Sequence, residues 1–129
     1  MPPCIVLRYQ ERTGSVPFDD WLDTLLHPGK AQNRVAARKL AAAVTRLATE
    51  GHALRRPTAA PLRDGIYELR VQVGRVNYRA LYFFAGVGVA VMAHGCTKEG
   101  AVADADIDRA VERCDAFLSA PRVHTASAT

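Results

Sequence analysis

The sequence of 129 residues has few cysteines and no long apolar run. Its three cysteines, Cys4, Cys96 and Cys114, lie far apart and lack CxxC or Cys/His spacing, which argues against a disulfide framework and a zinc site. No segment approaches the roughly 18 apolar residues of a membrane span, and no charged leader with an apolar stretch opens the chain. We therefore expect a cytoplasmic protein without a membrane segment.

Two catalytic classes also lack their signatures. The carboxylates form no metal-binding cluster, which argues against a two-metal nuclease. The serines and cysteines have no base at a recognisable spacing, which argues against a nucleophilic hydrolase. We predict neither a metal site nor a cofactor.

Lysine is scarce as well. Apart from Lys30, Lys39 and Lys98, arginine supplies the positive side chains of a chain whose net charge is +4. The guanidinium group is a planar, permanently charged fork that matches phosphate oxygens, so this bias favours a polyanionic partner. A genome rich in G and C favours arginine codons and explains the same bias equally well.

The hydrophobic pattern predicts a single α+β domain over residues 1–119 with the order β-α-α-β-β-β-α. A small antiparallel meander packs against a helical hairpin and a C-terminal helix. The predicted elements are a strand at 4–9, a helix that begins near Ser15 and Pro17 and is stopped by His27-Pro28-Gly29, a helix at about 30–50, strands at 66–73, 76–85 and 87–94, a loop at 95–100 and a helix at 104–119. The small, polar residues 120–129 predict a disordered tail.

The segment that leads into the meander is rich in arginine. It contains Arg55, Arg56, Arg63, Arg70, Arg75 and Arg79, against only Asp64 and Glu68. Because Gly74-Arg75 is typical of a two-residue hairpin turn, Arg70 and Arg79 are equally far from it and are expected side by side. Two neighbouring like charges cost stability unless an anion compensates them, as it does at a phosphate-binding site. In the alternative interpretation, Glu68 pairs with Arg70 and the arginines are structural.

Several other basic residues are candidates for the same face. We predict that Arg55, Arg56, Arg63 and Arg75 bind or guide nucleic acid. His94 ends the last predicted strand and Lys98 follows in a glycine-flanked loop, so both are expected at the rim. A histidine near its ordinary pKa can carry a proton, and a lysine can neutralise a phosphate. A half-buried histidine bonded to backbone and a solvated lysine are the alternatives.

Three motifs resemble a known family. They are LRDGIYELR at 62–70, YRALYFF at 78–84 and HGCTK at 94–98. In this order, behind a two-helix segment, they are similar to the phage-derived HigB-like toxins of the RelE/ParE superfamily, and the resemblance covers nearly the whole chain. It implies a RelE-like fold and a toxin that a helix-turn-helix antitoxin neutralises.

The resemblance also implies a reaction. Similar proteins are metal-independent endoribonucleases that cleave mRNA on the ribosome, where the 2'-hydroxyl attacks the neighbouring phosphate. By position, Arg79 matches the phosphate-binding arginine and Arg70 a basic residue on the preceding strand. Lys98 lies near the basic position after the last strand, and His94 is the histidine common in this subgroup. Substitution of Arg79 by alanine is then expected to relieve growth arrest and leave folding unchanged.

The sequence also departs from the family pattern. Glu68 stands where some relatives carry a second basic residue, and a tyrosine that some relatives use near the C-terminus is missing. Two alternatives follow: a ParE-like toxin that binds DNA gyrase without cleaving RNA, and an inactive relative that serves as an antitoxin-binding module.

Overall fold

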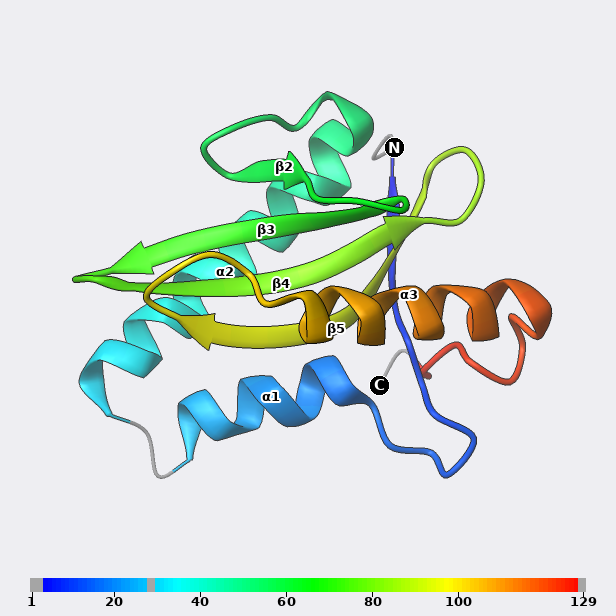
Figure 1. The fold of residues 1–129 in the computed structure, drawn as a ribbon, viewed down its shortest axis with the longest axis horizontal. Coiled ribbons are helices and arrows are strands. Elements are labelled where there is room, and N and C mark those ends of the chain that lie inside the picture. Colours follow the sequence, from blue (N-terminus) through cyan, green and yellow to red (C-terminus); the bar gives the residue numbers. More distant parts are fainter. Residues whose placement is uncertain (1–3, 28–29, 128–129) are drawn as a thin grey trace.

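The computed structural model describes residues 4–27 and 30–127 and contains one five-stranded sheet with three α-helices (Figure 1). In chain order the elements are β1 (Ile5–Arg8), α1 (Pro17–Leu26), α2 (Ala31–Glu50), a short 3-10 helix η1 (Gly51–Ala53), β2 (Ala59–Pro61), β3 (Ile66–Val73), β4 (Val76–Phe84), β5 (Val89–Lys98) and α3 (Asp104–Ser119). The strand order across the sheet is β1-β5-β4-β3-β2. No helix in the described ranges has the length and apolar character needed to cross a membrane.

The predicted α+β class, helical hairpin, meander and C-terminal helix are confirmed. Strands β3, β4 and β5 are consecutive and antiparallel, and β1 adds to β5 in parallel. The prediction missed β2, because two alanines and a proline carry little strand signal; this short edge strand exists through its pairing with β3. Pro28 and Gly29, which were expected to stop the first helix, lie outside the described residues.

The two faces of the sheet carry separate cores. Helices α1 and α2 pack on one face, where Phe18 and Leu40 meet Leu69 and Met92. Helix α3 lies across the other face, where Ile107 and Phe117 meet the sheet (Figure 1). In a strand, successive side chains point to opposite faces, so the alternation in β3 and β4 decides which residues α3 leaves uncovered.

Strand β5 is longer than predicted, and this changes the setting of Lys98. The glycine at position 95 suggested the end of the strand, but β5 continues to Lys98, which therefore lies in a strand and not in a loop. A Cβ atom on Gly95 would overlap the indole ring of Trp21. The glycine thus leaves room for the ring of Trp21 against the sheet, and it continues the strand because its backbone pairs with Ala80 of β4.

Residues 120–127, for which the sequence predicted a disordered tail, contact the rest of the chain in the structure, and residues 128–129 lie outside the described part of the chain. His124 is 4% exposed and stacks on Tyr9, with ring centroids 5.1 Å apart. Its Nδ1 bonds to the carbonyl oxygen of Gln10 at 2.7 Å, and Thr125 pairs with Tyr9 as an isolated bridge. This segment is therefore held against the outer edge of β1 by a buried histidine ring and by backbone hydrogen bonds to Arg8 and Gln10.

Candidate functional site

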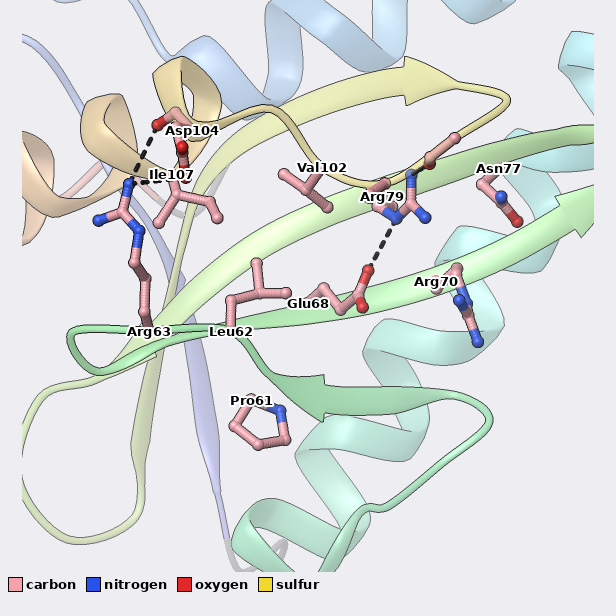
Figure 2. Close-up of a pocket in the computed structure, with 12 residues that line it drawn as sticks. Pro61, Leu62, Arg63, Glu68, Arg70, Asn77, Arg79, Val102, Asp104 and Ile107 are labelled. Atoms are coloured by element: carbon pink, nitrogen blue, oxygen red, sulfur yellow. Dashed lines mark hydrogen bonds and ion pairs between the residues drawn. The ribbon is translucent and has the colours of Figure 1, made fainter.

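A cleft of about 580 Å³ opens on the face of the sheet that α3 only partly covers (Figure 2). Strands β3 and β4 form its floor, and the loop from β5 into α3 forms one wall together with the first turns of α3. It is lined by Pro61, Leu62, Arg63, Glu68, Arg70, Asn77, Arg79, Gly100, Ala101, Val102, Asp104 and Ile107. Three of the predicted site residues therefore share one hollow.

The predicted neighbours Arg70 and Arg79 are confirmed as direct cross-strand partners in β3 and β4. Directly opposed residues in an antiparallel pair project to the same face, and both arginines line the cleft. The two-residue turn at Gly74-Arg75 produces this pairing, because it sets the register from Val73 and Val76 outward.

The two arginines differ in their partners. The Nε of Arg79 donates to Oε1 of Glu68 at 2.8 Å (Figure 2). Its Nη1 donates to the carbonyl oxygen of Gly100 at 2.7 Å. The side chains of Arg79 and Glu68 are only 5% and 8% exposed. This is a buried ion pair, so removal of one partner leaves the other charged and buried. The expectation that Arg79→Ala leaves folding unchanged does not fit this geometry.

Within the part of the chain that the structure describes, Arg70 is the arginine of the pair whose side chain has no partner. The alternative interpretation joined it to Glu68, but Glu68 pairs with Arg79 instead. No hydrogen bond or ion pair joins the half-buried side chain of Arg70 to any residue within 4–27 or 30–127. In Figure 2 it lies with Asn77 at the end of the cleft opposite Arg63. Its guanidinium group can therefore bind an anion without first breaking a contact.

Arg63 closes the other end of the cleft and is engaged by carboxylates. Its guanidinium donates to Asp108 at 2.6 Å and Asp64 at 2.9 Å, and it reaches Asp104 at 3.5 Å. The hydrogen bond to Asp108, followed by that to Asp64, raises the pKa of Arg63 above its ordinary value. These contacts join the loop before β3 to α3, so Arg63 has a structural role here. Few of its N–H donors remain for nucleic acid.

His94 does not line the cleft, because it lies on the flank of α3 that faces β5 and β1. Nη1 of Arg113 lies 2.9 Å from its Nδ1, and Oδ1 of Asp106 lies 2.8 Å from its Nε2. Arginine is always a donor, so Nδ1 accepts and the ring proton of the neutral histidine is assigned to Nε2. Burial lowers the pKa of His94, the bond to Asp106 opposes this, and Arg113 adds to the lowering. Both ring nitrogens are therefore occupied in this arrangement.

Lys98 meets the same network from the end of β5. Its Nζ lies 3.7 Å from Oδ2 of Asp106, and its side chain is 42% exposed. Its cross-strand partner is Asn77, which lines the cleft. The structure thus brings Lys98 and His94 together at Asp106, apart from the pair of Arg70 and Arg79. Lys98 itself does not line the cleft, but its strand partner does, whereas the strand partner of His94, Leu81, does not.

The other predicted basic residues lie around this face without forming one patch. Arg55 donates to the carbonyl oxygens of His52 and Leu54. Arg56, in the loop before β2, and Arg75, in the turn between β3 and β4, are exposed and make no ion pair within the described ranges.

Sequence reasoning missed two residues that organise the site. Asp106 lies in the first turn of α3, where the helix dipole favours an acidic residue, and its carboxylate joins His94 and Lys98. Arg113 lies two turns further along the same flank of α3 and also binds Glu11 at 3.3 Å. Their spacing of seven residues is the one available signal that they share a helix face. In the described part of the chain, no three or more His, Cys, Asp or Glu side chains are grouped to hold a metal ion.

Comparison with known proteins gives a family match. Residues 21–115 match the model of the family described as phage-derived protein Gp49-like (DUF891). This family falls within the RelE/HigB-type toxins in general and is associated with the toxins of toxin-antitoxin pairs. The matched segment runs from α1 through most of α3 and so includes every residue of the cleft. No curated protein matches the chain.

Proposed function

The chain belongs to the Gp49-like family of phage-derived proteins, and we propose that it is the toxin of a type II toxin-antitoxin pair that cleaves mRNA on the ribosome in the cytoplasm, without a metal ion. One observation carries the proposal: Arg70 and Arg79 lie side by side on the floor of an open cleft. The charges of Arg70, Arg79 and Glu68 sum to one positive charge. This net charge matches the single negative charge of one bridging phosphate of RNA.

In the proposed reaction the 2'-hydroxyl of one nucleotide gives its proton to water and its oxygen attacks the adjacent phosphorus, while the 5'-oxygen of the next nucleotide leaves and takes up a proton. The products are a 2',3'-cyclic phosphate and a 5'-hydroxyl. Negative charge builds on the non-bridging oxygens in the transition state, and guanidinium donors fixed by the fold stabilise it. Arg70 offers its whole guanidinium group, and Arg79 offers Nη2, from which no described residue takes a hydrogen bond.

The proton for the leaving oxygen is assigned to Lys98 in preference to His94. Both nitrogens of His94 are engaged by Asp106 and Arg113, and its ring would have to lose the bond to Arg113 before it could bind a second proton. Lys98 is half exposed and lies beside Asn77 at the cleft. In this scheme His94 and Asp106 hold Lys98, and Arg56 and Arg75 steer the RNA strand.

Expression in cells with sequencing of mRNA 5' ends tests the proposal. The parent chain is expected to arrest growth and to produce cuts that cluster at one position within codons. Arg70→Ala is expected to lose both effects, whereas Arg38→Ala, on the solvent face of α2, keeps them. Cuts that persist in Arg70→Ala would contradict the role of the cleft. Co-expression of the neighbouring helix-turn-helix antitoxin is expected to restore growth.

A second candidate function is favoured by the buried pair of Glu68 and Arg79. An arginine whose Nε and Nη1 are already occupied has little capacity left for phosphate, as expected of an inactive relative that binds an antitoxin. This alternative predicts normal growth on expression and retained antitoxin binding. A gyrase-directed toxin instead predicts arrest with intact mRNA and accumulating DNA breaks.

A further inference from the structure

A second hollow, of about 380 Å³, lies beside β2 and adjoins the cleft. Its lining is formed by His52, Leu54, Arg55, Ala59, Ala60, Pro61 and Tyr67. Pro61 also lines the cleft, so the two hollows meet at the last residue of this edge strand. Tyr67 packs against the core on the face that α1 and α2 cover, whereas Arg79 lines the cleft beside α3, so the second hollow lies on the other side of the β2 edge.

The second hollow presents flat rings. His52 is exposed and stacks on Phe84 with ring centroids 3.5 Å apart and planes 23° apart. Tyr67 is half-buried and meets Phe84 edge-on, with centroids 5.2 Å apart. One face of the His52 ring is thus fixed by Phe84, and the imidazole remains accessible to a second planar group. Every base of RNA has a π face that can occupy such a position.

The charge of the second hollow suits a polyanion. None of its described lining residues is acidic, in contrast to the cleft, which contains Glu68 and Asp104. The guanidinium of Arg55 is held at its rim by the carbonyl oxygens of His52 and Leu54. A side chain that is already ordered loses less rotamer freedom when it binds a ligand.

A short basic path connects the second hollow with the cleft. The exposed Arg56 follows Arg55 directly, and two residues later the carbonyl oxygen of Thr58 accepts a bond from the amide of Arg70 at 2.9 Å. The loop before β2 therefore carries Arg55 and Arg56 back to the strand position of Arg70. A single-stranded polyanion can follow this edge from one hollow to the other without meeting a carboxylate of the loop.

We propose that this second hollow binds a nucleobase of the RNA strand whose phosphate lies at Arg70, with the base stacked on His52 and the next phosphate near Arg55 or Arg56. This inference rests on the proposed function and adds to it a subsite that reads the substrate beside the cleavage point. Its volume falls near the lower end of the range of small-ligand sites, about 300–1,000 Å³, as expected for one base.

Binding of an uncleavable single-stranded RNA tests the subsite. The probe is a fluorescently labelled 2'-O-methyl oligonucleotide, used intact and in a series with one abasic position moved along the strand. For the full chain, His52→Ala is expected to weaken binding of the intact probe about 5- to 20-fold, from the loss of one stacked base. His52→Phe, which keeps a flat ring, is expected to restore it. His27→Ala, at an exposed histidine after α1, is the matched control and leaves binding unchanged.

The abasic series separates stacking from a general loss of affinity. One abasic position is expected to weaken binding of the probe to the parent chain as much as His52→Ala weakens binding of the intact probe. In the His52→Ala variant the same abasic position is expected to cause no further loss of affinity. Equal binding by the parent and His52→Ala, with Arg70→Ala weakened, would overturn the subsite and leave the proposed function standing. Absence of binding of the intact probe by the parent chain would overturn the subsite, whereas normal growth without mRNA cuts on expression of the parent chain would overturn the proposed function.

Discussion

The buried pair of Glu68 and Arg79 gives a quantitative prediction about stability. Replacement of either partner alone, Arg79→Met or Glu68→Leu, leaves one charge buried without its counter-ion, because both side chains are under a tenth exposed. Such changes cost about 3–5 kcal/mol, a large part of the roughly 5–15 kcal/mol by which a domain is stable. Arg70→Met is the matched control: it removes the same charge from a half-buried site without an ion pair in the described residues, and is expected to cost less than about 1 kcal/mol.

The double variant decides whether the cost comes from the pair. Glu68→Leu with Arg79→Met removes both charges and puts apolar groups of similar size in their place, which is often close to neutral. We expect its unfolding free energy to return to within about 1 kcal/mol of the parent, with a coupling energy of at least about 5 kcal/mol between the two positions. Urea denaturation, followed by circular dichroism and by fluorescence of Trp21, measures all four proteins. Losses that simply add in the double variant would refute the reasoning.

Three further outcomes are expected. Because burial holds the pKa of His94 below its ordinary 6.5, the unfolded chain binds a proton at His94 more tightly than the folded chain does. The unfolding free energy is therefore expected to fall as the pH drops below 6.5. His94→Gln is expected to reduce this fall in urea titrations at mildly acidic pH. Gly95→Ala forces a methyl group into the ring of Trp21 and is expected to cost about 1–3 kcal/mol and shift the tryptophan emission, whereas Gly100→Ala, with open space around it, does neither. His124→Ala is expected to cost about 2–4 kcal/mol through the lost stack and hydrogen bond, which a thermal melt would record; an unchanged melting temperature would mean that residues 120–127 add no stability.

The sheet was predictable because its signals are local. Alternation of side chains in β3 and β4, with a two-residue turn between them, is enough to place Arg70 opposite Arg79. Alternation also places Glu68 on that face. Alternation does not predict which arginine forms the ion pair with Glu68. That pairing depends on the loop after β5, where the carbonyl oxygen of Gly100 accepts a hydrogen bond from Arg79.

The parts that the sequence did not predict depend on contacts between distant segments. His94 and Lys98 were expected at the rim with the arginines, but α3 lies over this face and its Asp106 draws both to one flank. Composition predicted disorder after residue 119, yet a single histidine, His124, docks that segment on Tyr9. In each case one long-range packing contact outweighs the local pattern.

The central claim is that RNA bound in the cleft at Arg70 and Arg79 is cleaved by attack of the RNA's 2'-hydroxyl. Purified protein added to ribosomes carrying a defined mRNA tests it directly. The parent is expected to leave a 2',3'-cyclic phosphate at the cut, to spare a message with a 2'-deoxy nucleotide there, and to slow roughly 10²–10³-fold with Arg70→Ala but not with Arg38→Ala. Cleavage of the 2'-deoxy message, or an undiminished rate with Arg70→Ala, would contradict the account.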